Sequence, residues 1–214
     1  SIRFDAMLES LQKAATGDIV LLHGCCHNPT GMDLSPAQWN QVADVAAARQ
    51  LVPFVDLAYQ GFSENLDDDA YGVRMLIERV PEMIVTQSCS KNFGLYRDRV
   101  GALSFIAADE VTANTTLSQA LSTVRTMYSL PPDHGAAIVS HILGDPALRH
   151  EWLEELVGMR DRLKEMRQLL VSALSDAAPD HDFSHVLRTT GMFCYLGVTA
   201  EQVERLKGER GVYM

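Results

Sequence analysis

The chain has 214 residues, of which 47% are hydrophobic and 21% charged, and 18 basic against 28 acidic side chains give it a formal net charge of −10. This composition is typical of globular proteins and excludes disordered and fibrous classes. The negative charge argues against nucleic acid and anionic membranes as partners, because a negative surface repels both, and no apolar run reaches the ~20 residues that span a bilayer.

Short apolar runs alternate with helical patterns in the first half of the chain. The runs lie at residues 19–22, 52–55, 83–85 and 102–107 and have the length and composition of buried strands. After the first run, Ser35 and Gln38 form a capping-box pattern, and apolar residues recur from Trp39 onward with the period of one helix face. Strand, helix and strand in this order imply a right-handed parallel crossover. We therefore predict an α/β fold with a mainly parallel sheet between helices.

The second half of the chain is mostly helical in pattern. We predict helices that begin after Asp109, at His134 and after Asp145. The last of these runs to about Ala178, roughly 32 residues or about 48 Å at 1.5 Å per residue. Because this exceeds the width of one domain, we expect the helix to join two domains.

We place the domain boundary within that helix, with a larger domain over residues 1–157 and the start of a smaller α/β domain over residues 158–214. In the smaller part we predict a strand at residues 190–198 and a helix at residues 200–209. The chain begins without Met and ends just after an apolar segment that resembles the start of a strand. We therefore expect a piece of a longer protein that lacks both ends.

The cysteines and acidic residues also carry expectations. Four cysteines without regular spacing, and no signal-peptide pattern, favour a reduced, cytoplasmic protein. Cys25, Cys26 and Cys89 are expected to be small buried residues, as free cysteines usually are. The acidic run Asp67–Asp69 is expected to be a solvated loop.

Three polar clusters follow the predicted strands, where open α/β sheets bind ligands. Their sequences are HGCCHNPTG at residues 23–31, DLAYQG at 56–61 and SCSKNFG at 88–94. The first cluster invites a zinc interpretation, but adjacent Cys25 and Cys26 cannot easily face one tetrahedral ion, so we predict no metal site. Taken alone, Asp56 is either a helix cap or a functional carboxylate. Lys91 is either a surface charge or a desolvated, nucleophilic amine.

Taken together, the clusters resemble one family. HNPTG, DLAYQG and SCSKNFGLYRDRVG, in this order and with Asp56 35 positions before Lys91, resemble the fold-type-I pyridoxal-phosphate aminotransferases, and within them the aspartate and aromatic-amino-acid subgroup. The resemblance extends through TVRTMYS at 123–129 and GMF at 191–193, so it covers nearly the whole chain. It implies the pyridoxal-phosphate-dependent transferase fold, with residues 1–157 as part of the large cofactor-binding domain.

The resemblance also implies catalytic roles. Lys91 matches the lysine that bonds covalently to the cofactor and then transfers the substrate proton, so it needs no separate positioning. Asp56 matches the carboxylate that pairs with the pyridine nitrogen and keeps it protonated, which makes the ring an electron sink. Tyr59 and Asn28 match the residues that hydrogen-bond the phenolic oxygen of the cofactor, and Asn28 also lies beside the substrate.

Two further groups of residues have implied binding roles. Ser88, Ser90 and Arg99 match ligands of the cofactor phosphate, for which the guanidinium of Arg99 supplies a bidentate fork. Arg125 matches the arginine that reaches into the neighbouring subunit's site and binds the distal carboxylate of a dicarboxylic substrate. The resemblance therefore implies a homodimer with its site at the subunit interface.

The implied activity is reversible amino-group transfer between aspartate, glutamate or aromatic amino acids and 2-oxo acids such as 2-oxoglutarate. Leu130 stands where many aspartate-preferring relatives have Asn, so the choice between aspartate and aromatic substrates stays open. Two alternatives are a folded but inactive fragment and a non-catalytic cofactor-binding module of a regulator. The presence of Arg125 and the acidic charge argue against the regulator.

Overall fold

Four strands form the sheet at the centre of the computed structural model, which describes residues 2–213. In the order β1–β2–β3–β4 they are β1 (Ile19–His23), β2 (Val52–Leu57), β3 (Met83–Ser88) and β4 (Gly101–Ile106). The first three strands are parallel, and β4 runs antiparallel to β3. The loop at residues 89–100 joins β3 to β4 without a crossover helix, which is why β4 reverses direction. The prediction of an α/β fold with a mainly parallel sheet is confirmed.

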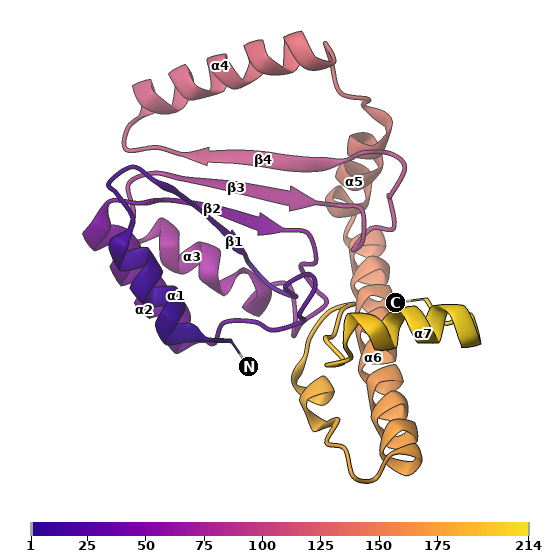
Figure 1. Cartoon of the computed structure of the whole chain (residues 1–214). Coiled ribbons are helices and arrows are strands. Elements are labelled where there is room, and N and C mark those ends of the chain that lie inside the picture. Colours follow the sequence, from indigo (N-terminus) through magenta and orange to yellow (C-terminus); the bar gives the residue numbers. More distant parts are fainter. Residues whose placement is uncertain (1, 214) are drawn as a thin grey trace.

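Three helices cover one face of this sheet (Figure 1). They are α1 (Phe4–Lys13), α2 (Pro36–Arg49) and α3 (Tyr71–Ile77). The predicted capping box starts α2, since Ser35 accepts from the Gln38 backbone and the Gln38 side chain accepts from that of Ser35. Alternate strand residues point at the helices, so Val55 and Met83 are 0% and 1% exposed. The core of the chain therefore lies between this face and the three helices.

The opposite face of the sheet is open over the described residues. Ile19 and Leu21 of β1 are 63% and 62% exposed and alternate with half-buried Val20 and buried Leu22. Strand register continues the Leu21 row through Phe54 and Ile84. The next row toward the carboxyl ends of the parallel strands is polar, and the candidate site begins there.

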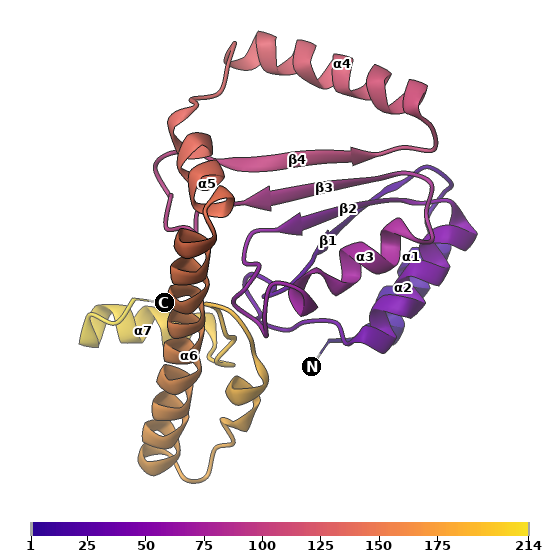
Figure 2. The same cartoon turned by 180° about the vertical axis from the view of Figure 1, so that it is seen from behind.

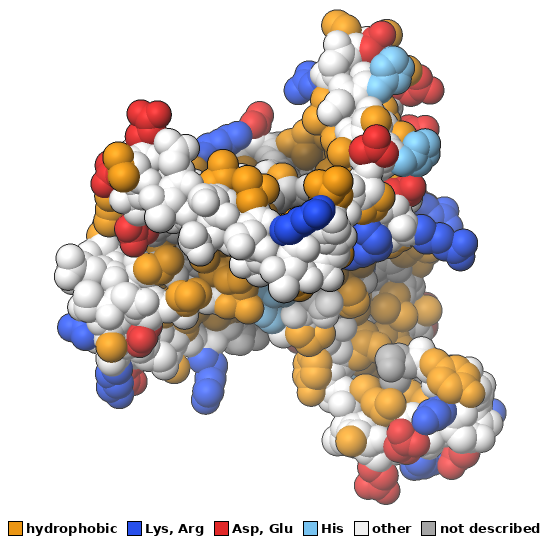
Figure 3. Space-filling view, turned by 90° about the horizontal axis from the view of Figure 1, so that it is seen from above, with side chains coloured by type: hydrophobic (Ala, Val, Ile, Leu, Met, Phe, Trp, Pro, Cys, Tyr) orange, Lys and Arg blue, Asp and Glu red, His pale blue; other side chains and the backbone are white. Residues whose placement is uncertain are grey.

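Two helices follow β4 before the long helix. The first, α4 (Glu110–Met127), is capped by Asp109 as predicted, and it runs along the outer edge of the sheet (Figure 1). None of its residues is buried, and Figure 3, which looks onto this side, shows hydrophobic side chains over its surface. The second, α5 (His134–Gly144), begins where predicted.

The long helix α6 (Pro146–Ala177) has 32 residues and extends well beyond the sheet, as Figure 2 shows from behind. The one-turn helices η1 (Asp68–Ala70) and η2 (Ser184–Arg188) and the helix α7 (Ala200–Arg210) complete the described elements. The end of α6 agrees with the prediction to within one residue. No helix within residues 2–213 is long and apolar enough to cross a membrane.

Two expectations about local structure are wrong. Residues 190–198 do not form a strand, because no extended segment among the described residues pairs with them. Instead, Thr190 donates its backbone N–H to Gly31 O over 2.7 Å and its hydroxyl to Asp33 over 2.7 Å. In the acidic run, Asp67 and Asp68 are exposed as expected, but Asp69 is only 4% exposed, because its carboxylate accepts hydrogen bonds from three backbone N–H groups.

Candidate active site

The carboxyl ends of the parallel strands carry one polar row. Register places His23 of β1 beside Asp56 of β2, and Asp56 beside Thr86 of β3. The Thr86 hydroxyl donates to Asp56 Oδ1 over 3.2 Å. Asp56 is thus a half-buried carboxylate at a strand end with a fixed orientation. Sequence reasoning singled out Asp56 but missed Thr86 and did not place His23 beside it. The alternating pattern of β3 puts Thr86 on the open face, but only strand register pairs it with Asp56.

Lys91 and Tyr59 meet just beyond this row. The Lys91 ammonium nitrogen lies 4.5 Å from the centroid of the Tyr59 ring, within the range of a cation–π interaction. Tyr59 is 6% exposed, and its ring meets Phe193 edge-on at 5.7 Å between centroids. Within residues 2–213 no hydrogen bond or ion pair engages the Lys91 ammonium. Its amine is therefore held in place by an aromatic ring and uncommitted to any carboxylate in the described chain.

The turn that carries Lys91 is anchored from two sides. The Asn92 side chain donates to Gln60 O over 3.2 Å. From α6, the Trp152 indole donates to Asn92 O over 2.7 Å and stacks on the Phe93 ring at 4.3 Å. The sequence pattern predicted the long helix but gave Trp152 no role in the site. The structure shows that α6 also positions the turn on which the candidate nucleophile sits.

The predicted phosphate ligands lie along the same segment, residues 88–99. Ser90 is 6% exposed, and its backbone N–H donates to Ser88 Oγ over 3.1 Å. Arg99 is exposed, has a backbone φ of 52°, and donates to Tyr96 O over 3.0 Å. The Ser88 hydroxyl is therefore held against the backbone of Ser90, whereas the Arg99 guanidinium makes only a local contact among the described residues.

Asn28 lies on the loop that follows β1. Its side chain is exposed, and its backbone N–H donates to His23 Nδ1 over 3.3 Å. The His27 ring bonds Thr30 Oγ1 over 2.9 Å, and burial, with His23 nearby, lowers the pKa of His27. Asp33 accepts from the His27 backbone over 3.3 Å. These contacts hold the loop against the end of β1, so Asn28 is presented close to the polar row.

Arg125 is not part of this group of residues in the single chain. It lies in the last turn of α4, is exposed, and donates to the hydroxyl of Ser129. Its guanidinium therefore bonds to the turn that ends α4 and, among the described residues, to no side chain of the polar row.

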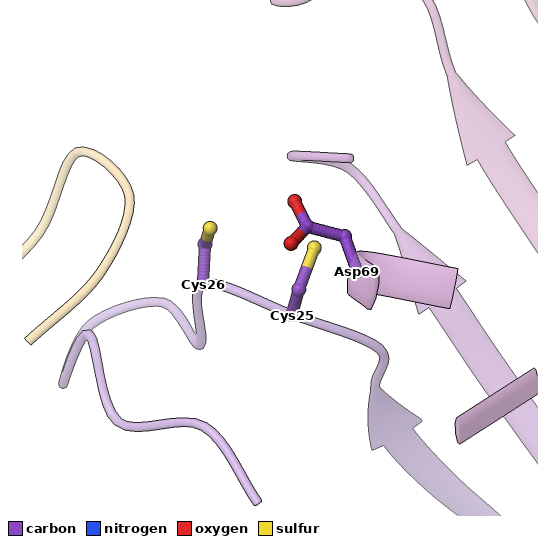
Figure 4. Close-up of side chains that lie close together, drawn as sticks. All are labelled: Cys25, Cys26 and Asp69. Atoms are coloured by element: carbon purple, nitrogen blue, oxygen red, sulfur yellow. The ribbon is translucent and has the colours of Figure 1, made fainter. Parts of the chain in front are cut away.

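Two buried thiols lie close to the same site. Cys25 and Cys26 are 3% and 0% exposed, whereas Cys89 is only half-buried. A hydrogen bond with the Cys26 side chain, together with burial, raises the pKa of the Cys25 thiol far above its ordinary value. Contrary to the expectation that the adjacent thiols would diverge, both point to one side of their loop, with the Asp69 carboxylate beside them (Figure 4).

The geometry allows a specific chemistry. A carboxylate at the end of β2 can pair with a cationic ring nitrogen, and an uncommitted amine can react with an aldehyde. The Tyr59 phenol and the Asn28 amide can donate to an oxyanion, and the two serine hydroxyls can bind phosphate. The residues present therefore fit a phosphorylated aldehyde that contains a basic heteroaromatic ring.

Comparison with known proteins identifies the family. Residues 1–214 match the family model described as aminotransferase class I and II. The aspartate aminotransferase of Haemophilus influenzae is 46% identical over 213 residues, which are 100% of this chain and 54% of that protein. The aromatic-amino-acid aminotransferase of Pseudomonas aeruginosa is 48% identical over 210 residues, covering 98% of this chain and 53% of that protein.

Solved structures agree with this result. The aromatic-amino-acid aminotransferase from Burkholderia pseudomallei, covalently bound to pyridoxal phosphate, superposes with a TM-score of 0.95 at 49% identity over 99% of this chain and 53% of its own. A mitochondrial aspartate aminotransferase from Trypanosoma brucei superposes with a TM-score of 0.96 at 47% identity, over 100% of this chain and 56% of its own. The chain thus spans about half the length of its relatives, and the predicted transferase fold is confirmed. The chain belongs to the class I and II aminotransferase family.

Proposed function

We propose that the protein is an aminotransferase that uses pyridoxal 5′-phosphate to move an amino group reversibly between an amino acid and a 2-oxo acid. The observation that carries this proposal is the pair of a fixed carboxylate, Asp56 at the end of β2, and an uncommitted amine, Lys91 in the turn after β3, at the carboxyl edge of the sheet. Family membership supports it, because relatives at 46% and 48% identity are named aminotransferases.

Each residue then has a physical task. When bound, pyridoxal phosphate supplies an electron sink for the charge that develops at the substrate Cα. Asp56 would hold a proton at the ring nitrogen, and the hydrogen bond from Thr86 fixes the orientation of its carboxylate for that task. Lys91 anchors the cofactor and moves the proton at the substrate Cα, a general acid–base role for a positioned amine. The face of the Tyr59 ring contacts the Lys91 amine and holds it in position.

The remaining residues bind and select. Ser88, Ser90 and Arg99 would hold the phosphate, and Asn28 would donate to the phenolic oxygen of the cofactor beside the substrate. Arg125 would bind a distal carboxylate in the partner subunit's site, so we propose a homodimer. We propose aspartate, glutamate or aromatic amino acids as donors and 2-oxoglutarate as acceptor. Relatives named for aspartate and for aromatic amino acids have nearly equal identity, so both substrate classes stay in the proposal.

Two further parts of the proposal concern organisation. Residues 1–157 would belong to a large cofactor-binding domain, and residues 158–214 would begin a small domain, with α6 shared between them. The few, irregularly spaced cysteines favour a reduced, cytoplasmic location.

Covalent labelling of the full-length protein tests the function. Borohydride reduction of the cofactor-loaded protein, followed by peptide mapping, should place the pyridoxyl group on Lys91. Lys91→Ala should keep noncovalent cofactor but lose most turnover, because anchor and base are removed together. Lys164→Ala is the control, since Lys164 pairs with Glu64 across 3.4 Å and should be dispensable. A label on another lysine would contradict the proposal, and labelling of Lys91 without turnover would favour the non-catalytic regulator.

A further inference from the structure

The loops after β1 and β2 bring two thiols and a carboxylate together in the protein interior. Cys25, Cys26 and Asp69 are 3%, 0% and 4% exposed, and their sulfur and carboxylate oxygen atoms lie within 4.8 Å of one another. In extended backbone, adjacent side chains point to opposite sides. Cys26 has a φ of 51° instead, and this left-handed backbone lets both thiols face Asp69 (Figure 4).

We propose that Cys25, Cys26 and Asp69 bind one thiophilic divalent cation such as Zn²⁺. Zinc binds thiolate sulfur at about 2.3 Å and carboxylate oxygen at about 2.0–2.2 Å. Two ligands of one ion are therefore at most about 4.6 Å apart, so the observed cluster needs only small shifts to bind it. A disulfide suits the pair less well, because bridged Cα atoms are usually about 4.4–6.8 Å apart and adjacent ones are about 3.8 Å apart.

The Asp69 carboxylate is oriented for this role by its surroundings. Its Oδ2 accepts from the backbone N–H groups of Gly61 and Ser63 over 2.7 and 3.1 Å, and its Oδ1 accepts from that of Glu64 over 2.9 Å. A carboxylate offers about four lone-pair sites, so one on Oδ1 remains for an ion. Hydrogen bonds of this kind fix a ligand's direction and raise its affinity for a metal.

A route to the cluster and a place for a fourth ligand are both present. A cavity of about 360 Å³ is lined by Cys25 and Asp69, and by the carboxylates of Asp33 and Glu64. Three protein ligands leave one tetrahedral position for a water molecule, as in open zinc sites. The acidic lining would also attract a cation into the cavity.

The charge of the bound state can be balanced by the protein. On binding, the two thiols would release their protons to solvent, and two thiolates with one carboxylate would exceed the charge of a divalent ion by one negative unit. Arg167 of α6 is half-buried beside the loop that carries Cys26. It also donates to Gly191 O, and Gly191 packs directly on the Cys26 side chain. The guanidinium can therefore compensate the remaining charge.

The cation would link two loops that carry proposed site residues. Cys26 already donates to Tyr59 O over 3.8 Å, and Asn28 follows two positions after Cys26 on the same loop. A shared ion would couple these loops and should stabilise the native state, because it binds only the folded arrangement. The proposal does not depend on amino-group transfer.

Cadmium titration of the intact protein tests the site. Cd²⁺ should produce an ultraviolet thiolate charge-transfer band that saturates at one ion per chain, and Zn²⁺ should displace it. Losing a residue that only hydrogen-bonds a metal ligand weakens metal binding by roughly 10–100-fold. Cys25→Ser and Cys26→Ser each remove a ligand itself, so each should weaken Cd²⁺ binding by at least that much. Cys89→Ser, which alters a half-buried thiol outside the cluster, should leave the band unchanged. No band, or a band that persists in Cys25→Ser, would overturn the proposal.

A measurement on the unmodified protein covers the case in which a serine variant fails to fold. X-ray absorption at the zinc edge should show two sulfur ligands at about 2.3 Å together with oxygen. A coordination shell of nitrogen and oxygen alone would overturn the proposal.

Discussion

Thr86 and Asp56 are register partners on neighbouring parallel strands, and the threonine hydroxyl donates to the aspartate carboxylate over 3.2 Å. The bond spans residues 30 positions apart in the chain. It ties the orientation of the proposed charge partner to the pairing of β2 with β3, so the geometry of the site depends on the sheet itself.

Removing this hydroxyl should lower activity without unfolding the protein. Thr86→Val keeps the shape of the side chain but loses the hydrogen bond. A hydrogen bond to a charged group contributes about 1.5–3 kcal/mol, which is equivalent to roughly 10–100-fold in rate if all of it acts in the transition state. Steady-state kinetics should show the loss in kcat, and Thr86→Ser should restore much of it. A fall in melting temperature without a change in kcat would instead assign Thr86 a structural role.

The negative charge of Asp56 should matter more for activity than the length of its side chain. Asp56→Ala should lower kcat far more than Asp56→Glu, because only the alanine variant removes the carboxylate that holds the ring proton. The absorption spectrum of the cofactor-loaded protein would report the same difference. Equal losses in the two variants would mean that Asp56 has a local structural role and is not a charge partner.

Arg125 should discriminate between substrate classes. Breaking a buried ion pair by removing one partner costs about 3–5 kcal/mol, so Arg125→Ala should lower kcat/KM for aspartate by roughly 10²–10³-fold. Phenylalanine, which has no distal carboxylate, should be affected much less. Arg149→Ala, an exposed arginine on α6, is the matched control. Parallel losses for both donors would show that Arg125 maintains the dimer or the fold.

Two glycines in helices should respond oppositely to alanine. A Cβ at Gly72 of α3 would overlap the buried indole ring of Trp39, and overpacking of this kind typically costs about 1–3 kcal/mol. A Cβ at Gly158 of α6 would meet nothing within 4 Å, so Gly158→Ala should stabilise by roughly 0.5–1 kcal/mol. Urea unfolding of both variants would measure the difference. Similar shifts in both would contradict the packing argument.

The cap of α4 should make stability depend on acid pH. The Thr112 backbone N–H donates to Asp109 over 2.7 Å and lowers the pKa of that carboxyl below its ordinary value of 3.8. Because the pKa of Asp109 is lower in the folded state, its ionised carboxylate stabilises the fold at pH values above 3.8. This stabilisation is lost as the pH falls from 3.8 through the folded-state pKa. Asp109→Asn keeps a capping oxygen but cannot titrate. The free energy of unfolding, measured from neutral to acid pH, should therefore fall less steeply for Asp109→Asn than for the unaltered protein.

Local patterns in the sequence determined much of the secondary structure. The apolar runs predicted the positions of all four strands, because short runs of β-forming residues favour strands. The expectation that all four are buried is wrong for β4, most of whose residues are exposed in the described chain. The caps at Ser35, Asp109 and Asp145 predicted helix starts, since each satisfies nearby backbone groups. The motifs around Asp56 and Lys91 were enough to identify the family, because they occur in the order and at the spacing that the family has.

Only the tertiary structure decided how distant residues meet. Residues 190–198 were predicted as a strand, but a strand needs a neighbour, and Thr190 bonds Gly31 and Asp33 instead. Asp69 is buried because three backbone N–H groups of one turn donate to its carboxylate. The Cys25 and Cys26 thiols point to the same side of their loop because of the left-handed backbone at Cys26. Each of these depends on backbone conformation or on contacts far apart in sequence. Composition and periodicity describe neither, so this part of the site became visible only in three dimensions.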